Sequence, residues 1–255
     1  MRQIRCETIL DYEISTESKE ACIDLILSWI RSEGGPRYFV CANPHSLEVA
    51  QSDSLFDTSI RSADLLVPDG VGVVMASKIL GGAIRDRITG SDIFWGLNEA
   101  LNRETKYSCY FLGSTDDTLE EIRKKMEREY PNIKVAGLYP PPFKPDFGEY
   151  DNKLMCDAVN REAPDVLWVG MTAPKQEKWV FRNRENLNVK FIGPVGAVFD
   201  FFVGKVKRSH PIFQAMGLEW LPRLLQEPRR LWRRNFISNP HFILRVIRSR
   251  FAHGK

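Results

Sequence analysis

The sequence predicts an α/β fold with a mainly parallel sheet flanked by helices. Short apolar runs alternate along the chain with longer segments in which apolar residues recur every three or four positions. Strands that alternate with helices in this way form parallel sheets covered by the helices. The composition fits a folded globular chain, because 43% of the 255 residues are hydrophobic and 27% are charged.

Six short apolar runs are the predicted strands. They cover residues 37–42, 64–67, 107–112, 133–139, 165–170 and 189–193. Most end at a turn signal, such as Asn43-Pro44 after the first or Asp69-Gly70 after the second. Ligands of open parallel sheets bind at the carboxyl ends of the strands, so the residues that follow these runs are the first candidates for a site.

The segments between the runs have helical periodicity. The predicted helices cover residues 17–32, 43–62, 91–103, 114–130, 153–162 and 176–186, with a further helix beginning near Val71. Gly34-Gly35-Pro36 ends the first helix, and the proline-rich segment 140–145 is a predicted loop.

The charge is distributed unevenly along the chain. Residues 205–255 carry twelve Lys and Arg against two acids, a net charge of +10, whereas residues 1–204 carry a net charge of −7. Aromatic residues, among them Trp220, Trp232 and Phe236, lie between these bases. A solvated helical face is the simpler explanation, but this combination favours an anionic partner, namely a membrane, nucleic acid or phosphate. We therefore predict a catalytic domain over 1–204 and a basic helical appendage over 205–255.

Several classes of protein are disfavoured. Residues 1–14 do not resemble a signal peptide, and there is no apolar stretch of about 18 residues that would span a membrane. The five cysteines are scattered without a C-x-x-C pair, which favours a reducing cytosol over a disulfide framework.

The turn Asp69-Gly70-Val71-Gly72 carries the clearest chemical signal. Glycines between a strand and a helix allow a phosphate or sugar to approach the backbone, and a helix N-terminus favours an anion. The pattern resembles the start of a dinucleotide fingerprint, but Met75 occupies its third glycine position. Asp69 is then either a helix cap or a carboxylate placed to accept a proton.

Other strand ends offer weaker candidates for substrate binding. Besides Gly70 and Gly72 they are Asn43, Gly113, Gly170, Lys175, Gln176 and Gly193. Lys175 and Gln176 could reach a diphosphate or a sugar hydroxyl, although both also suit an ordinary first turn of a helix.

No cofactor or metal ion is predicted. The sequence has no Asp-x-Asp pair, its four histidines are dispersed, and it has no Walker loop or Gly-x-Ser-x-Gly elbow. A leaving phosphate would then be stabilised by arginines or backbone amides.

Together, several segments resemble the WecG/TagA/CpsF family of bacterial glycosyltransferases (glycosyltransferase family 26). The matching segments are CANPHS (41–46), ADLLVPDGVGVVMASKILGG (63–82), RITGSD (87–92), FLGS (111–114), GMTAPKQE (170–177), GPVGAVFDFFVGKVKRSHP (193–211) and GLEWLPRLLQEPRRLWRR (217–234). No single segment is specific, but their combination in one order is.

The resemblance implies a Rossmann-like, metal-independent, inverting transferase. It implies transfer of a sugar from a UDP-sugar to a polyprenyl-diphosphate-linked saccharide, in the biosynthesis of exopolysaccharide, teichoic acid or capsule. It further implies that Asp69 is the general base, that Arg87 contacts substrate and that Gln176 lines the donor pocket. By the same resemblance, three arginines of the appendage act at the active site: Arg223, Arg230 and Arg233.

Two positions depart from the family pattern in the expected acceptor pocket. Cys41 stands where the teichoic-acid members usually carry threonine, and His45 where they often carry glutamate. The resemblance therefore leaves the donor and acceptor sugars open, with N-acetylmannosamine, its uronic acid, glucose and glucuronic acid among the possible donors.

The expected partners are the UDP-sugar, the lipid-linked acceptor and an anionic membrane surface, with a homo-oligomer left open and no nucleic acid. The expected location is cytoplasmic, peripheral on the inner face of the bacterial plasma membrane. Two alternatives remain at this point, namely an NAD(P)-dependent oxidoreductase that uses the Gly70 turn and a nucleic-acid-binding module that uses the basic appendage.

Overall fold

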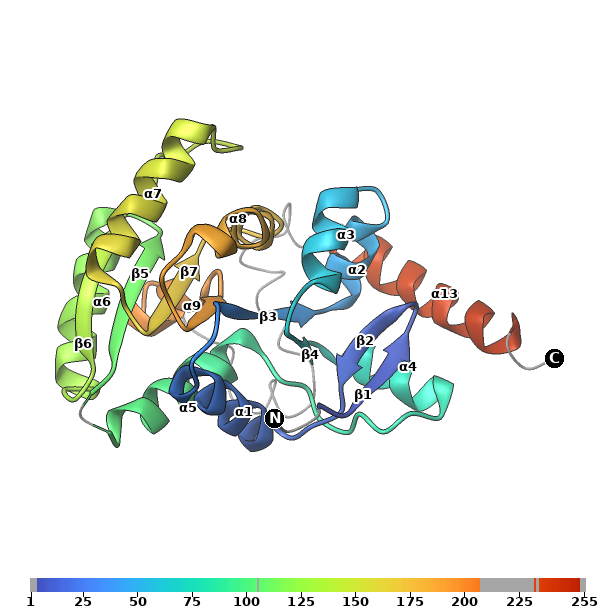
Figure 1. The fold of residues 1–255 in the computed structure, drawn as a ribbon. Helices are drawn as coiled ribbons and strands as arrows, with labels where there is room; N and C mark the ends of the chain where they lie inside the picture. The colour runs from blue at the N-terminus through green and yellow to red at the C-terminus, as the bar shows by residue number, and fades with distance from the viewer. Residues whose placement is uncertain (1–3, 105, 207–231, 233, 253–255) are drawn as a thin grey trace.

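The computed structural model describes residues 4–104, 106–206, 232 and 234–252. Within them, six parallel strands form one sheet in the order β4-β3-β8-β7-β5-β6 (Figure 1). The strands are β3 (Arg37–Ala42), β4 (Leu65–Pro68), β5 (Ser108–Gly113), β6 (Lys134–Tyr139), β7 (Val166–Gly170) and β8 (Phe191–Pro194). The predicted Rossmann-like α/β fold is confirmed.

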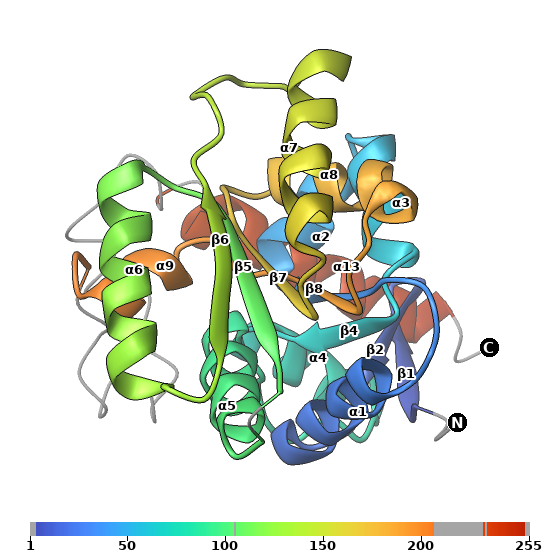
Figure 2. The same ribbon diagram turned by 60° about the vertical axis from the view of Figure 1, so that its left-hand side comes forward.

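Helices cover both faces of this sheet (Figure 2). One layer contains α1 (Lys19–Arg31), α5 (Gly90–Asn102), α6 (Asp116–Glu129) and α9 (Val198–Val203). The other contains α2 (Pro44–Ala50), α3 (Ser54–Arg61), α4 (Val71–Leu80), α7 (Glu149–Glu162) and α8 (Lys175–Asn183). Successive strand residues point to opposite faces, so Phe39 joins the first layer and Val40 the second.

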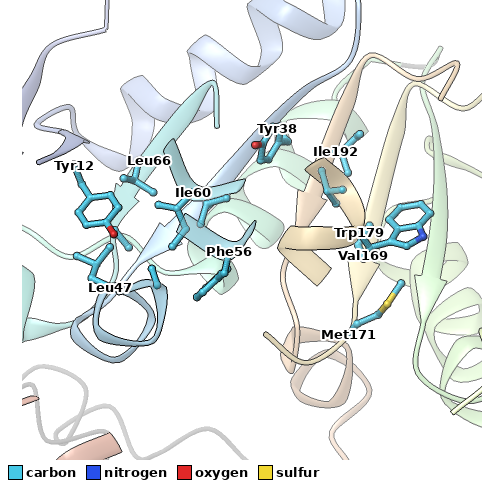
Figure 3. Close-up of a cluster of buried hydrophobic side chains, with 14 of the residues drawn as sticks. Tyr12, Tyr38, Leu47, Phe56, Ile60, Leu66, Val169, Met171, Trp179 and Ile192 are labelled. Carbon is cyan, nitrogen blue, oxygen red and sulfur yellow. The ribbon is translucent and has the colours of Figure 1, made fainter. Parts of the chain in front are cut away.

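The buried cluster on the α2–α8 face extends across the sheet (Figure 3). Leu47, Phe56 and Ile60 come from α2 and α3, while Val169 and Trp179 come from β7 and α8. Helices α2, α3 and α8 therefore lie in one layer. Of these, α2 begins at the end of β3 and α8 shortly after the end of β7.

An N-terminal hairpin was not predicted. It consists of β1 (Cys6–Ile9) and β2 (Tyr12–Ser15), joined by Leu10 and Asp11 with φ values of 48° and 68°. A two-residue hairpin turn with positive φ values usually carries Asn-Gly or Asp-Gly. This turn has leucine at its first central position, so the sequence lacks the usual turn signal. The hairpin forms a separate sheet and packs Ile9, Tyr12 and Ile14 into the α2–α8 cluster.

Other helix boundaries differ from the predictions. The helix predicted over 43–62 is two helices, because Asp53 caps a new one by accepting a hydrogen bond from the Phe56 N–H at 3.1 Å. Helix α7 begins at Glu149 rather than 153, and α8 ends at Asn183 before a short 3₁₀ turn. The short helix α9 was not predicted, since an apolar run of this length fits a helix or a strand equally well.

A C-terminal helix packs against the α2–α8 cluster. A π-helical turn (Arg234–Ser238) leads into α13 (Asn239–Ala252), which lies beside α2 and α4 (Figure 1). Phe242 and Val246 are fully buried in the α2–α8 cluster, and Glu48 of α2 pairs with His241 and, at 2.8 Å, with Arg245.

None of the helices among the described residues is both long and apolar enough to cross a membrane.

Candidate functional site

The ends of β3 and β4 lie side by side and place Asn43 next to Asp69. Ala42 pairs with Pro68, and the Asp69 N–H donates a hydrogen bond of 2.8 Å to the Ala42 carbonyl. The Asn43 side-chain oxygen caps α2 by accepting from the Ser46 N–H at 3.0 Å. The two predicted residues thus share one edge of the sheet, where helices α2 and α4 begin.

Asp69 stands one residue before the cap of the helix that follows it. The N-cap residue of α4 is Gly70, with a φ of 99°. The role of Asp69 as a base stays a prediction.

Gly72 brings the first turns of α2 and α4 together. A Cβ at this position would lie 2.5 Å from Cγ of Pro44, in the first turn of α2. Only glycine allows this close packing, which concentrates two helix N-termini, and hence two partial positive charges, beside Asp69.

The segment 87–92 joins the same edge. The Ile88 N–H donates to the Pro68 carbonyl at 2.7 Å, which places the half-buried Arg87 directly beside the end of β4. Thr89 and Asp92 form a capping box at the start of α5, with 2.6 Å between the Thr89 hydroxyl and the Asp92 carboxylate. Asp92 therefore has a structural role that its motif did not reveal.

Cys41 lies at the centre of these strand ends. Burial raises the pKa of its thiol well above the ordinary value, and the carboxyl groups of Asp69, Glu177 and Asp92 raise it further. A thiol with such a pKa stays protonated at neutral pH and is a poor nucleophile. The structure thus brings together Cys41, Asn43 and Asp69 as predicted neighbours and adds two carboxyl groups, Asp92 and Glu177.

Gln176 and Glu177 are buried in the first turn of α8, and Glu177 lies near the Cys41 thiol. Their exposed fractions are 5% and 6%, and Gln176 Nε2 donates a hydrogen bond of 2.8 Å to Glu177 Oε1. Burial raises the pKa of the Glu177 carboxyl to about 7. A Cβ at Gly196, after β8, would lie 3.6 Å from both the nitrogen and the oxygen of the Gln176 amide, so the backbone at Gly196 packs beside this side chain.

Glu177 was not among the predicted site residues. The sequence offered a weak signal, because Glu177 lies three residues before the buried Val180 and residues with this spacing share one side of a helix. Trp179, two residues after Glu177, lies on a different side of the helix.

Lys175 faces a different part of the molecule. Its ammonium donates to the Lys144 carbonyl at 2.8 Å and lies 4.6 Å from the centroid of the Phe147 ring. Burial lowers the pKa of Lys175, while Asp146 opposes that shift. The loop 144–147 holds this lysine, and its role toward substrate stays a prediction.

Three predicted glycines have packing reasons to be glycine. A Cβ at Gly113, where φ is 134°, would overlap the Gly170 carbonyl group. At Gly170 it would overlap the Phe199 ring, and at Gly193 the Trp168 ring. Their contact with substrate stays a prediction.

The predicted arginines Arg223, Arg230 and Arg233 lie outside the described residues. In the parts of the chain that the structure describes, no three His, Cys, Asp or Glu side chains are grouped so that they could hold a metal ion.

The arrangement suits proton transfer next to an anion. Asp69 stands at the carboxyl edge of the sheet, and the helices that follow β3, β4, β5, β7 and β8 all begin there. A carboxylate can accept a proton, while helix N-termini stabilise a phosphate that becomes more negative as a bond breaks.

Comparisons with known proteins agree with this chemistry. The sequence model of the "Glycosyl transferase WecG/TagA/CpsF family" matches residues 7–255. An N-acetylglucosaminyldiphosphoundecaprenol N-acetyl-beta-D-mannosaminyltransferase of Bacillus spizizenii is 31% identical over 86% of this chain and 81% of its own length. Enzymes of the same name from Bacillus subtilis and Staphylococcus aureus strain MW2 are 32% and 26% identical, over 81% and 84% of this chain and 77% and 80% of their own lengths.

These matches favour the transferase over the oxidoreductase and the nucleic-acid-binding module. They span the strand ends around Asp69 and extend into the basic appendage. The chain therefore belongs to the WecG/TagA/CpsF family and is a glycosyltransferase.

Proposed function

We propose that this glycosyltransferase moves a hexosyl group from a UDP-sugar to a saccharide linked to polyprenyl diphosphate, with inversion and without a metal ion. The names of the relatives support the acceptor class, because those enzymes act on N-acetylglucosaminyldiphosphoundecaprenol. They also support a role in the biosynthesis of a cell-envelope polymer. The donor sugar need not be the N-acetylmannosamine of the relatives, since 31% and 32% identity leaves room for a different pocket.

The position of Asp69 is the observation that carries the proposal. In the proposed reaction its carboxylate takes the proton of an acceptor hydroxyl, and the hydroxyl oxygen attacks the anomeric carbon. The bond between that carbon and the diphosphate oxygen breaks, and the electron pair leaves with UDP. Because attack and departure occur on opposite faces of one carbon, its configuration inverts.

The surroundings of Asp69 support a direct displacement. The Cys41 thiol, which stays protonated, does not offer a competing nucleophile. The N-termini of α2 and α4 lie beside Asp69 and favour the negative charge that develops on the leaving diphosphate. Arg87 and the arginines of the appendage, Arg223, Arg230 and Arg233, are proposed to complete this stabilisation.

An apolar stripe on the C-terminal segment supports attachment to a membrane. Leu244, Ile247 and Phe251 are exposed at 52%, 36% and 74%, on the side of α13 opposite the buried Phe242 and Val246. Exposed Arg248 and Arg250 lie on α13 as well. A helix with an outward apolar stripe and flanking arginines suits the interface of an anionic bilayer.

The preceding turn extends this apolar surface. Trp232, Phe236 and Ile237 are each at least half exposed, and the rings of Trp232 and Phe236 lie 4.7 Å apart. We therefore propose a peripheral location on the inner face of the plasma membrane, where the lipid-linked acceptor is found.

Exposed residues of α4 offer a path from the lipid to the site. Val71 and Met75 are 39% and 48% exposed, one helical turn apart, and Val71 is two residues from Asp69. Since α13 packs against α4, the proposed membrane surface and the proposed base lie on the same layer of helices.

A donor screen with purified protein tests the proposal. UDP release is measured with a panel of UDP-sugars and polyprenyl-diphosphate saccharides, with and without EDTA, and NMR gives the anomeric configuration of the product. We expect turnover with at least one pair, an inverted product and no loss of activity in EDTA. A retained configuration, or loss in EDTA that Mg²⁺ or Mn²⁺ restores, would contradict the mechanism.

A further inference from the structure

The pair Gln176–Glu177 contains two buried oxygens without a hydrogen-bond partner among the described residues. They are Gln176 Oε1 and Glu177 Oε2, whereas the other ends of the same two groups bond to each other at 2.8 Å. Buried polar atoms without a partner are costly and uncommon in folded proteins. Such a pair beside the strand ends of the proposed active site indicates a function rather than a contribution to stability.

Burial disfavours a negative charge on Glu177, whereas the hydrogen bonds from the Gln176 amide and the Glu177 N–H favour one. From β3, β4 and α5, the groups gathered at Cys41 are the thiol itself and the carboxyl groups of Asp69 and Asp92. In the described part of the chain no lysine or arginine pairs with Glu177. The two lysines of the same helical turn are engaged elsewhere, Lys178 with Asp53 and Lys175 with the Lys144 carbonyl.

The hydrogen bond between the two side chains fixes the direction of the Gln176 amide. Because Glu177 Oε1 accepts from the amide nitrogen, the amide oxygen is directed away from Glu177 as an acceptor for another group. Gly196 covers the same amide, so the side chain has little freedom to turn.

We propose that Glu177, in its uncharged form, is a positioning residue that holds the Gln176 amide in the site, and that sugar transfer fails when this carboxyl group loses its proton. The inference rests on the proposed function, since it names a residue and a pH dependence for that reaction. An ionised Glu177 would add an unpaired negative charge close to Asp69 and to the approaching diphosphate, which is unfavourable for both.

The experiment compares the pH dependence of transfer in wild type, Glu177→Gln, Glu177→Ala and the control Glu185→Gln. Glutamine is uncharged and keeps an oxygen that can accept from Gln176. Glu185 is an exposed acid after the same helix, so its change removes the same charge outside the site. Each variant is assayed with the donor and acceptor that wild type uses.

We expect wild type and Glu185→Gln to lose activity about tenfold per pH unit on the alkaline side. Glu177→Gln should stay within about threefold of the wild-type maximum and lack this decline, because it has no proton to lose. Glu177→Ala should fall on the order of 10²-fold at every pH, since Gln176 is no longer held. The proposal is overturned if Glu177→Gln is as inactive as Glu177→Ala, or if it keeps the wild-type decline.

Infrared difference spectra provide a readout that does not depend on turnover or on the stability of one variant. The C=O stretch of a protonated, buried carboxyl group should be present in wild type near neutral pH, disappear at alkaline pH and be absent from Glu177→Gln and Glu177→Ala. A wild type that turns over no UDP-sugar would contradict the proposed function. A wild type that turns over but lacks this band would contradict the uncharged Glu177.

Discussion

Three carboxyl groups near the Cys41 thiol differ in what holds them, and this difference separates their roles. Asp92 is engaged by the backbone and hydroxyl of Thr89, as a cap of α5. Glu177 is buried beneath the site and bonded to Gln176. Asp69 and Asp92 are both half-buried, but Asp69 stands at the end of β4 and outside the capping box, which makes it the carboxyl group of the three best placed to meet a substrate hydroxyl.

Replacing Asp69 with asparagine tests its role as the base. The variant keeps the shape of the side chain but cannot accept a proton, so turnover should fall on the order of 10²–10⁴-fold. UDP affinity by calorimetry and the free energy of unfolding should stay close to wild type, because asparagine keeps the size of the side chain and the N-cap residue of α4 is Gly70. Asp157→Asn is the control, since that acid lies exposed on α7 beside Lys153 and its loss should leave turnover intact. Turnover of Asp69→Asn within a few-fold of wild type would exclude the proposed role.

The Glu177 carboxyl group should make the protein less stable as the pH rises. Its pKa is raised from 4.5 to about 7 in the folded state, so the folded protein binds the proton more tightly than the unfolded chain. The stabilisation is complete below about pH 4.5 and is lost as the pH rises through about 7, a change of about 3 kcal/mol at 1.36 kcal/mol per pKa unit.

Urea unfolding at pH 5 and pH 8 measures this change as the difference between wild type and Glu177→Gln. The variant should gain stability relative to wild type at the higher pH, whereas Glu185→Gln should follow wild type. An equal pH dependence in wild type and Glu177→Gln would show that the carboxyl group titrates normally.

The elements that place the site had strong local signals, whereas those that were missed depend on tertiary contacts. Strands 37–42 and 165–170 and the turn at Asp69-Gly70 could be predicted because apolar runs end at clear breakers. The β1–β2 hairpin could not, because Leu10 adopts a positive φ only where the packing of Ile9 and Tyr12 enforces it. Likewise, the burial of the inner face of α8 depends on tertiary contacts, because α8 packs against α3, more than a hundred residues earlier in the chain.

Helix α13 has two faces with different environments. Phe242 is fully buried against α2 and α4, and Phe251, nine residues later, is 74% exposed. The ion pairs of Glu48 with His241 and with Arg245 help determine which face of α13 points toward the core. The helix therefore joins the core on one side while it presents the apolar stripe on the other.

Alanine substitutions at these two phenylalanines should have opposite effects. Phe242→Ala leaves a cavity in the core and should lower the free energy of unfolding by about 3–4 kcal/mol, measured in urea. Phe251→Ala should change that free energy by less than about 0.5 kcal/mol but weaken binding to anionic vesicles, measured by flotation. If Phe251→Ala binds vesicles as well as wild type, the stripe is not a membrane surface.

At the scale of the whole molecule, opposite charges occupy different parts of the chain. Residues 1–204 carry −7 and residues 205–255 carry +10, yet α13 packs on the same layer as α2 and α4, which begin at the proposed base. The negative body would be repelled by an anionic bilayer, so the basic segment sets the orientation. In the proposed arrangement the edge of the sheet that holds Asp69 stays close to the lipid head groups.

Removing two positive charges from α13, and in a second variant two from α6, tests this orientation. Arg248 and Arg250 are exposed on α13, whereas Arg123 and Arg128 are exposed on α6, in the layer on the other face of the sheet. Arg248→Gln with Arg250→Gln should weaken binding to anionic vesicles by about 2 kcal/mol, roughly 30-fold, because each arginine at the surface contributes about 1 kcal/mol.

Arg123→Gln with Arg128→Gln lowers the net charge equally but should change vesicle binding less than about threefold, since charges farther than a Debye length of about 8 Å are screened. Turnover on a short water-soluble acceptor should be the same for both double variants, because none of the four arginines is part of the proposed site. Equal losses of vesicle binding in the two pairs would mean that net charge alone attracts the protein and that α13 does not face the bilayer.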